Sequence, residues 1–218
     1  MPTPDQTVEP LGRRERKKVE TRRAIRDAAL ALALEGGVDG MTVARISEVA
    51  DIAPRTFFNY FSCKEDALVT DGAGAGAQLR EAIVARPEGE APVDALRAAI
   101  IASDFVAGMQ SGREQMRQRH CLIQDDPALL TRQLAQFAAV ERAFAEGVAV
   151  RTGLDPDDLR PATLAALALG VVRVAVRRWT ADGSESPADL IASGFDLLQH
   201  GVFAEGATTR PAEGATPA

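Results

Sequence analysis

Apolar residues near the start of the chain recur at the spacing of an amphipathic helix. One face collects residues three, four and seven positions apart, namely Ile25, Ala28, Ala29 and Leu32. This pattern predicts a first helix from about Arg13 to Glu35. Glycine readily adopts the backbone conformations that end a helix, so we expect Gly36, Gly37 and Gly40 to terminate it.

Two short helices are predicted next. Thr42 is a suitable N-cap for the first, Val43 to Ala50, because its hydroxyl can accept a backbone N–H bond. The inner face of this helix should hold Val43, Ile46, Val49 and Ala50. Residues 51–53 form a tight turn, and Pro54 opens the second helix at a position where its missing N–H costs nothing. That helix is expected to end near Phe61.

A fourth helix is expected to start at Ser62, with Glu65 as its capping-box partner. It runs into Gly72, Gly74 and Gly76, each of which costs about 1 kcal/mol relative to alanine inside a helix. We therefore expect this glycine stretch to be kinked, frayed or mobile. Later helices are predicted at about 93–110, 113–124, 127–152, 157–181 and 187–203.

The last two predicted helices carry more apolar surface than one buried face requires. In the final helix, apolar spacings of three and four continue through Ala188, Ile191, Phe195, Leu198 and Val202, as in a packed bundle. Gly194 and Gly201 would allow a neighbouring helix to approach closely. The preceding helix is apolar almost all round from Ala162 to Val176, so we expect it to be buried on more than one side. Either the chain's own core or a partner subunit covers this surface.

Charge is unevenly distributed along a chain whose net charge is −6. Residues 13–26 carry eight basic and two acidic side chains, whereas the rest of the chain is acidic. A basic segment on an acidic body suits contact with a polyanion such as DNA. The alternative is a solvated helix whose charges bind no ligand. Residues 1–12 and 204–218 are polar or rich in small residues, so we predict two disordered tails.

Composition narrows the fold class and the setting. Hydrophobic residues make up 46% of the chain and form no alternating β-branched runs, which favours an all-α fold. Cys63 and Cys121 have neither metal-binding spacing nor a disulfide framework. No apolar run reaches the roughly 20 residues of a membrane span, and the basic N-terminal segment lacks the apolar stretch of a secretory signal. We therefore predict a cytoplasmic protein with no cofactor, no metal and no membrane contact.

The predicted helix from Pro54 to Phe61 separates aromatic from polar side chains. Phe57 and Phe61 are four residues apart, so both should fill the core of a three-helix unit. The other side carries arginine and asparagine, which can pair with guanine and adenine, and hydroxyls that reach phosphate oxygens. The DNA-binding candidates are Thr42, Arg45, Arg55, Thr56, Asn59, Tyr60 and Lys64. The alternative is a short helix with ordinary surface residues.

The stretch Thr42–Ile46 and the run Ala50–Leu68 resemble the TetR/AcrR repressors in order, spacing and residue type. The resemblance covers about the first seventy residues. It implies an all-helical homodimer of about nine helices per subunit, whose last two helices form a four-helix interface. It also implies a helix-turn-helix DNA-binding domain over 13–68 and a ligand-binding and dimerisation domain over 69–203.

By the same resemblance, Thr42, Tyr60 and Lys64 match phosphate-contacting positions, and Arg55 and Thr56 match positions that face the major groove. The chain departs from the family pattern at two places. Asp51 replaces a glycine in the turn, where the backbone can require a left-handed conformation that Asp tolerates. Cys63 replaces a proline or a small polar residue. It is interpreted as a passive residue, with a redox sensor as the alternative.

An effector pocket is predicted among helices 93–181. Its lining candidates, each of which is alternatively plain core, are Phe105, Met109, Met116, Phe137, Val140, Phe144, Leu167, Val171 and Val174. Arg113, Arg117, Arg119 and His120 form either an anion site or a solvated basic face. The stretches 149–153 and 172–179 resemble, more weakly, the mycofactocin-system regulators, a TetR subgroup with members described as sensing acyl-CoA thioesters.

These observations predict a ligand-responsive transcriptional repressor that binds a palindromic operator in double-stranded DNA and is released by a largely apolar effector. An all-helical enzyme is the second hypothesis. It is disfavoured because the sequence has no acid–base pair, no nucleophile with a base and no phosphate-binding loop. A protein-interaction module is the third hypothesis, and it leaves the polar face of the helix at residues 54–61 unexplained.

Overall fold

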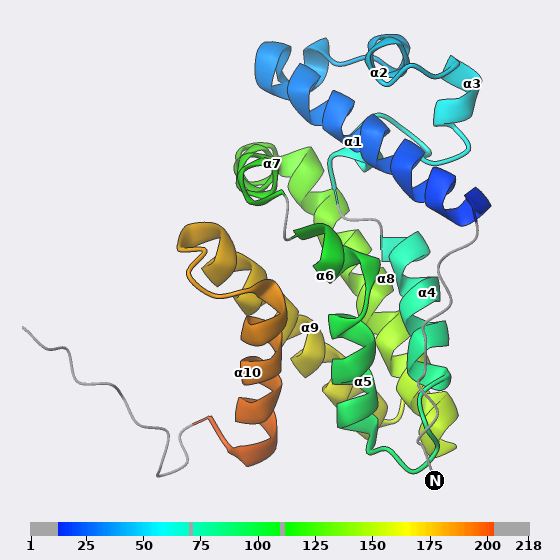
Figure 1. Cartoon of the computed structure of the whole chain (residues 1–218), viewed down its shortest axis with the longest axis vertical. Coiled ribbons are helices and arrows are strands. Elements are labelled where there is room, and N and C mark those ends of the chain that lie inside the picture. Colours follow the sequence, from blue (N-terminus) through cyan, green and yellow to red (C-terminus); the bar gives the residue numbers. More distant parts are fainter. Residues whose placement is uncertain (1–12, 70–71, 110–111, 203–218) are drawn as a thin grey trace, which may run out of the picture. The chain divides into compact units, whose positions relative to one another are not determined.

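The computed structural model describes residues 13–69, 72–109 and 112–202, and over these ranges the chain is helical without a strand. The predicted all-α class is therefore confirmed (Figure 1). In chain order the elements are α1 (Arg13–Gly40), α2 (Val43–Val49), α3 (Pro54–Phe57), the 3-10 helix η1 (Glu65–Ala67), α4 (Gly72–Val84), α5 (Pro92–Ile101), α6 (Asp104–Met109), α7 (Arg113–Asp125), α8 (Pro127–Thr152), α9 (Leu159–Ala181) and α10 (Pro187–His200). The predicted tails at 1–12 and 204–218 lie outside the described residues.

The chain forms two units by its contacts. One unit is Met1–Gln78 with Ser111–Ala143, and the other is Leu79–Gln110 with Phe144–Ala218. The division falls within α4 and α8, which both continue from one unit into the other. The boundary expected at residue 68 is a division by function, and it stays a prediction.

The core of the first unit is built around α1. The four residues predicted to share one face of this helix are all buried, as expected. Phe57 and Phe61 lie in the same cluster and are 0% and 5% exposed, which confirms their predicted role. Ile123 and Leu129, at the end of α7 and the start of α8, complete the cluster. Burial of each large apolar side chain contributes about 1.5–3 kcal/mol, so this cluster is what holds α2 and α3 against α1.

Two helix ends differ from the prediction. The first helix continues to Gly40 instead of ending near Glu35, but its backbone leaves the helical region at Gly37, where φ is 74° and ψ is 169°. The glycine stop signal therefore acts as a kink inside α1. The helix that starts at Pro54 ends at Phe57, and hydrogen-bonded turns carry the chain on to Phe61. The Phe61 N–H still donates to the Phe57 carbonyl at 3.1 Å, which keeps both rings on one side.

The predicted inner face of α2 is wrong at one residue. Val49 is 58% exposed, whereas the unpredicted Ser47 is buried beside Ile46. With a turn of 100° per residue, Val43, Ile46, Ser47 and Ala50 fall within an arc of about 100°. Val49 lies about 100° from the centre of that arc, outside the buried face.

The capping box predicted at Ser62 is absent. The residue before η1 is Lys64, and no side chain caps that 3-10 helix. The regular fourth helix starts only at Gly72, so the prediction of one continuous helix from Ser62 is wrong. The short η1 segment instead buries Ala67 against the core of the first unit.

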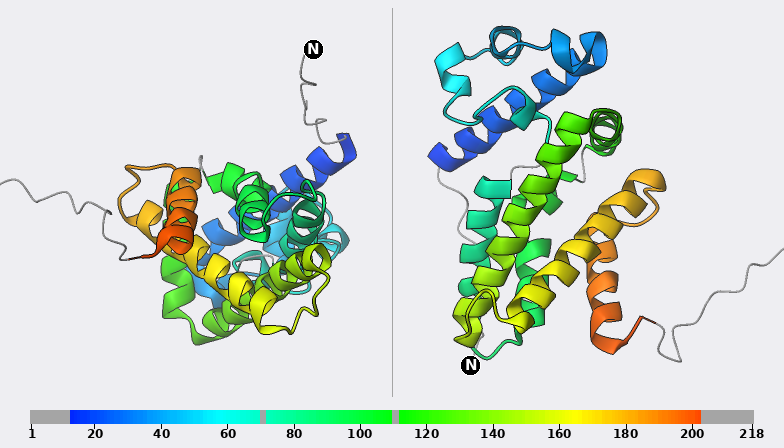
Figure 2. Two further views of the ribbon diagram at one scale, coloured as in Figure 1. Left: turned by 90° about the horizontal axis from the view of Figure 1, so that it is seen from below. Right: turned by 180° about the vertical axis from the view of Figure 1, so that it is seen from behind.

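The glycines of α4 allow close packing against α8, in contrast to the expected kink (Figure 2, right). The Gly72 N–H donates to Gln136 Oε1 at 2.8 Å, and a Cβ at Gly72 would lie 2.2 Å from the Gln136 carbonyl oxygen. A Cβ at Gly76 would lie 3.1 Å from the Ala143 Cβ. These glycines are therefore in regular helix, and their missing side chains bring the two helices together.

In the second unit, the predicted helix 93–110 is divided into α5 and α6. Ser103 lies at the break, where its hydroxyl donates to the Ile100 carbonyl at 2.6 Å and accepts from the Val106 N–H at 3.4 Å. This side chain satisfies backbone groups at the end of one helix and the start of the next. The division adds one helix to the number expected from the family resemblance.

Helices α9 and α10 form a helical hairpin whose contact includes Gly194, as predicted. A Cβ at Gly194 would lie 2.5 Å from Val171 Cγ1, so only glycine fits there. Ile191 and Phe195 are buried as expected, but Val202 is largely exposed because α10 ends at His200. The 23 residues of α9 are also long and apolar enough to cross a membrane by length and composition alone, a property that core helices of soluble proteins share.

Candidate functional site

The helix-turn-helix geometry is fixed by the turn between α2 and α3. Asp51 adopts the left-handed conformation expected of it, with φ at 52°. The Ile52 N–H donates to the Ser47 carbonyl at 2.9 Å, which closes the turn over the end of α2. At the other end, the Thr42 hydroxyl accepts from the Arg45 N–H at 3.2 Å, which confirms the predicted N-cap.

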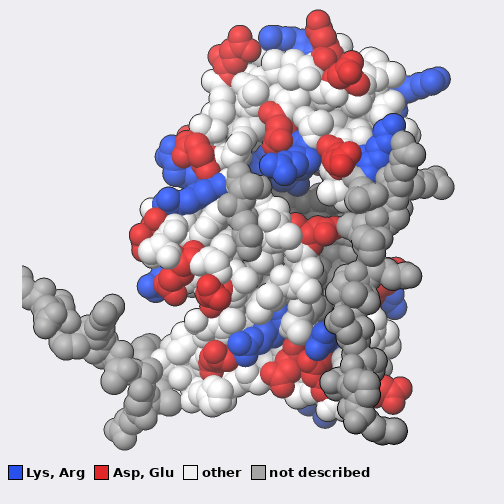
Figure 3. All heavy atoms as spheres, viewed as in Figure 1, with Lys and Arg blue, Asp and Glu red and all other residues white. Residues whose placement is uncertain are grey.

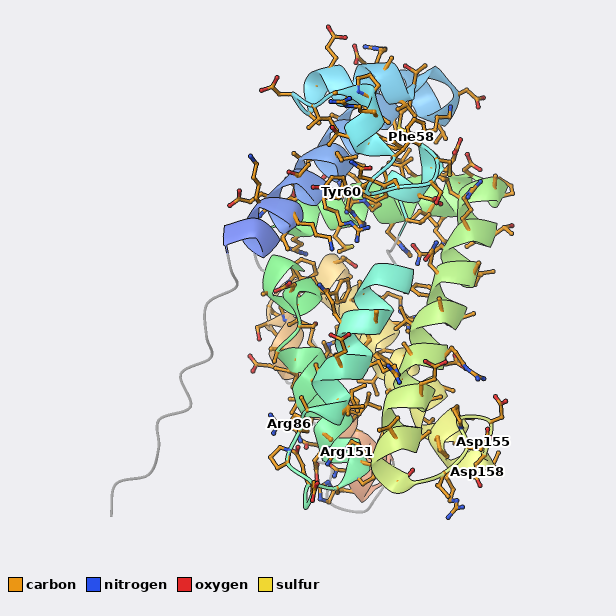
Figure 4. The ribbon with its side chains drawn as sticks, turned by 90° about the vertical axis from the view of Figure 1, so that its right-hand side faces the viewer. Phe58, Tyr60, Arg86, Arg151, Asp155 and Asp158 are labelled. Atoms are coloured by element: carbon orange, nitrogen blue, oxygen red, sulfur yellow. The ribbon has the colours of Figure 1, made fainter. Side chains whose placement is uncertain are left out.

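The side of α3 opposite the core presents polar side chains to solvent. Arg55 and Asn59 are exposed, and Thr56 and Tyr60 are half-buried. Phe58 is also 59% exposed (Figure 4). Its ring meets the buried Phe57 ring edge-to-face, with the two ring centroids 5.5 Å apart. The sequence prediction missed Phe58, because it assigned Phe57 and Phe61 to the core and gave no position to the aromatic residue between them. Its helical position, 100° from Phe57, was the available signal.

Arg22 of α1 holds the segment that follows α3. Its guanidinium donates to the Tyr60 carbonyl at 2.9 Å and lies over the Phe61 ring, 5.1 Å from the ring centroid. A cation over an aromatic face adds about 0.5–2 kcal/mol, depending on burial. Arg22 therefore helps to position Tyr60. The sequence prediction had treated Arg22 only as part of a basic segment.

Two DNA-binding candidates have partners within the protein. The Lys64 ammonium donates to the Val38 carbonyl at 2.9 Å and lies 3.9 Å from a Glu65 carboxylate oxygen. Arg45 lies 3.6 Å from Glu35 in an exposed ion pair, which is worth at most about 1 kcal/mol. Arg45 can therefore exchange this partner for a phosphate at little cost, whereas Lys64 also fixes the kinked end of α1.

On the face shown in Figure 3, the surface around these helices carries both signs of charge. There, Lys and Arg side chains are interspersed with Asp and Glu side chains over α1, α2 and α3. Within the basic segment, Lys17 and Lys18 are exposed, whereas Arg22 and Arg26 are half-buried. Only part of the predicted basic segment is therefore available to a polyanion.

Cys63 has no environment that activates a thiol. Partial burial raises the pKa of the Cys63 thiol, with a smaller opposing effect from the Asp66 backbone N–H. Because the thiolate is the reactive form, a raised pKa favours the interpretation of Cys63 as a passive residue.

The effector-binding candidates occupy different environments. Three of the nine, Met116, Phe137 and Val140, belong to the first unit, and the other six belong to the second. Met109, Val140 and Phe144 are buried, and Phe105, Met116, Phe137 and Val171 are half-buried. Leu167 is 47% exposed on α9, as is Val174 at 51%, so both lie on the outer side of that helix rather than in a core.

A cleft of about 340 Å³ lies in the second unit, and none of these candidates lines it. It is lined by Pro92, Val148, Thr152, Leu154, Arg160, Pro161 and Leu164. Nearby, Arg151 donates to the carbonyls of Ile83, Arg86, Pro87 and Glu90 at 2.7–3.3 Å (Figure 4). One guanidinium thus holds the end of α4 and the loop after it, a role that the sequence did not reveal.

Family comparisons agree with this geometry. Residues 25–69 match the family described as bacterial regulatory proteins, tetR family. Residues 90–203 match the family described as MftR C-terminal domain. Two families with adjacent matches thus cover most of the described chain, and the first match contains α2, α3 and the turn between them.

Individual proteins are similar over almost the whole chain. The HTH-type transcriptional regulator TcmR of Streptomyces glaucescens is 31% identical over 204 residues, 89% of each chain. The mycofactocin biosynthesis transcriptional regulator MftR of Mycobacterium tuberculosis is 29% identical over 187 residues, 86% of this chain and 93% of MftR. Both are described as regulators of transcription.

Solved structures share the fold. The TetR-family repressor FadR of Thermus thermophilus, in complex with lauroyl-CoA, is 23% identical with a TM-score of 0.50, covering 90% of this chain and 100% of FadR. SmeT of Stenotrophomonas maltophilia, in complex with triclosan, is 20% identical with a TM-score of 0.54, covering 88% of this chain and 98% of SmeT.

Proposed function

Because the chain belongs to the TetR family of bacterial transcriptional regulators, we propose that it is a repressor released from a palindromic operator by a small effector. The family, the helix-turn-helix and the regulatory role are the premise. The sign of regulation, the residues that contact DNA and the chemistry of the effector are the proposal. No catalytic step is part of this role, which belongs in the cytoplasm with the DNA.

One observation carries the proposal for DNA binding. Buried Phe57 and Phe61 fix α3 and the turns after it, so that Arg55, Phe58 and Asn59 face solvent together. We assign base contacts to Arg55, Thr56 and Asn59, and apolar contact with a thymine methyl group to Phe58. Thr42, Arg45, Tyr60 and Lys64 are assigned to phosphates, which set the register of α3 on the duplex.

A gel-shift titration against the DNA upstream of the protein's own gene tests this assignment. Arg55→Ala should relax base preference at one operator position and cost about 1–3 kcal/mol of binding there. Tyr60→Ala should weaken binding to all sequences alike with an unchanged salt dependence, because a neutral hydroxyl on a phosphate releases no counterion. Arg160→Ala is the control, since this exposed arginine lies in the second unit and pairs with Asp158. Equal binding by all three variants would exclude α3 as the DNA-reading helix.

We further propose that α9 and α10 form the homodimer interface. Leu159, Leu167 and Val174 are 80%, 47% and 51% exposed and recur at spacings of eight and seven, which places them on one side of α9. Leu197 of α10 is exposed as well. A second copy of the same helices is the proposed cover for this apolar surface, as an alternative to the membrane that the hydropathy of α9 would also permit.

The effector is proposed to be largely apolar, of the acyl-CoA type. The match to the MftR C-terminal domain and the lauroyl-CoA bound to the FadR of the same fold support this class. The proposed lining is the part of the predicted set that lies in the second unit and not on the outer side of α9, namely Phe105, Met109, Phe144 and Val171. Thermal-shift titration with acyl-CoAs of increasing chain length tests the class. If no chain length raises Tm, the acyl-CoA proposal fails while the DNA-binding proposal stands.

Release from the operator is proposed to follow from differential affinity. An effector that binds one conformation of the dimer more tightly shifts the population toward it. If the two α3 helices of that conformation no longer match the half-site spacing, operator affinity falls. Helix α4, which continues from one unit into the other, is the proposed connecting element.

A further inference from the structure

A group of arginines joins α1 to α7 within the first unit. Arg22 and Arg26 lie one turn apart on α1, and Arg119 lies on α7, which packs against α1. Their charges interact, because burial together with Arg119 and Arg22 lowers the pKa of Arg26 to about 9. The three guanidinium groups therefore form one cluster, which we call the α1–α7 arginine cluster.

Arg119 differs from the other basic residues of its helix. It is only 8% exposed, and its Nε has no hydrogen-bond partner among the described residues. Arg113, Arg117 and His120 of α7 are exposed, and Arg117 pairs with Glu114 at 2.8 Å. The two predictions for the basic face of α7 thus apply to different residues, with a solvated face around Arg117 and a buried charge at Arg119.

Arg26 and Arg119 are not fully compensated by the acidic side chains that the structure describes. Asp27 is the acidic side chain whose charge acts on Arg26 and Arg119, but it is exposed and lies 3.7 Å from Arg23. Arg26, Arg119 and Asp27 together carry a local charge of +1. An ion removed from water without a partner costs several kcal/mol, so this arrangement favours an added anion.

We infer that the α1–α7 arginine cluster binds a phosphate-type anion through Arg119 and Arg26. A phosphate group carries a charge of about −1.5 to −2 at neutral pH, which is enough to offset this excess. Guanidinium groups match phosphate oxygens with paired N–H donors, and the unpartnered Nε of Arg119 supplies one donor of such a pair. Arg22 is left out of the anion site, because it has partners of its own, among them the Tyr60 carbonyl.

Occupancy of this site has a consequence for regulation. Arg22 connects the cluster to Tyr60 and Phe61 next to α3, so an anion between α1 and α7 acts on the element that positions the recognition segment. This consequence rests on the proposed function. The binding itself does not, because it can be measured without DNA.

The test is anion binding by the full-length protein at constant ionic strength. Inorganic phosphate, diphosphate and CoA are titrated by calorimetry and by thermal shift against wild type, Arg119→Met and the control Arg117→Gln. Wild type should bind at least one probe saturably, with a Tm rise of about 5–10 °C at one hundred times Kd. Arg119→Met should weaken binding at least about tenfold, and Arg117→Gln should leave it unchanged.

The arms separate the sources of the phosphate. If CoA binds more tightly than phosphate, and Arg119→Met abolishes this difference, the phosphate bound by the cluster belongs to a larger effector. If the two bind equally tightly, the natural ligand is free phosphate. In phosphate-free buffer, Arg119→Met should unfold at the same or a higher temperature, because it removes an uncompensated charge. Should Arg119→Met not fold, Arg26→Gln replaces it with the same expectations.

Three results would overturn the inference. The first is absence of saturable binding of all three probes by wild type. The second is unchanged phosphate affinity in Arg119→Met, with or without a lower Tm. The third is a shallower salt slope of operator binding in Arg119→Met with phosphate binding intact, which would assign the cluster to the DNA backbone. If wild type binds its operator but none of the anions, the proposed function is retained and the anion site is rejected.

Discussion

Adjacent aromatic residues in this protein have opposite environments. Phe57 is fully buried and Phe58 is 59% exposed, although both are phenylalanines in one short helical segment. The core selects every third or fourth residue, so side-chain type alone does not decide which ring is inside. Exposure of a large apolar ring beside Arg55 and Asn59 is best explained by a partner with apolar groups, such as thymine methyls.

Phe58→Ala should therefore lower operator affinity by about 1–2 kcal/mol, roughly 5- to 30-fold, with little change in stability. Phe57→Ala should instead destabilise the fold by about 3–5 kcal/mol, because it empties a buried position. Fluorescence anisotropy with labelled operator and urea unfolding measure the two effects. A Phe58→Ala protein with normal operator affinity would show that the exposed ring has no part in recognition.

Arg151→Ala should destabilise the protein by about 2–3 kcal/mol. The change removes the donors to four backbone carbonyls in and after the end of α4, and three of these hydrogen bonds are partly buried, whereas the one to the Pro87 carbonyl is exposed. Arg160→Ala is the matched control, because its exposed pair with Asp158 contributes little. Thermal unfolding of both variants gives the comparison, and equal Tm values would mean that water replaces Arg151 without cost.

At the scale of elements, helix contacts decide what glycine does in α4. Intrinsic propensity predicts a weak helix at Gly72 and Gly76, yet the segment is regular where it packs on α8. The close approach of α4 and α8 adds van der Waals contacts between them, and these contacts offset the low helix propensity of glycine. The same reasoning applies to Gly194, which receives Val171 of α9.

Gly72→Ala should consequently destabilise the protein by about 1–3 kcal/mol, since its Cβ overlaps the Gln136 backbone. Gly108→Ala in α6 has open space around the new Cβ and should stabilise by up to about 1 kcal/mol. Urea unfolding of the pair checks the opposite signs. If both changes stabilise, α4 does not pack on α8 as closely as described.

At the scale of the whole molecule, a net charge of −6 is combined with a segment near the N-terminus that is rich in arginine. The acidic body disfavours nonspecific contact with DNA, so binding depends on the α3 surface and on two copies acting together. Each half-site adds to affinity only if the dimer holds both α3 helices at the operator spacing. A change that prevents dimer formation should therefore also weaken operator binding.

Leu167→Glu combined with Val174→Glu should convert the protein to a monomer at micromolar concentration. Each glutamate would place an unpaired charge in the proposed α9–α10 interface. Loss of the second half-site should lower operator affinity by at least about 100-fold. Leu134→Glu on α8, at a position equally exposed, is the control. Sedimentation velocity gives the mass, and a double variant that remains dimeric would place the interface elsewhere.

The sequence predicted most helices because apolar periodicity and Gly or Pro stops are local properties. It identified the buried face of α1, the N-cap at Thr42 and the left-handed turn at Asp51. It failed at Val49, Ser62 and the α4 glycines, where the result depends on contacts with distant residues. The polar side of α3 was predicted correctly except for Phe58, while the α1–α7 arginine cluster required α7 to be placed beside α1.

The sequence by itself determined the all-α class, the helix-turn-helix and the family, because each rests on residues close together in the chain. The tertiary structure decided which arginines are buried and which glycines receive another helix, since these depend on segments that meet across long sequence separations. Arg22 and Arg119 are 97 positions apart, yet both act on Arg26, the first by adjacency in α1 and the second only through folding.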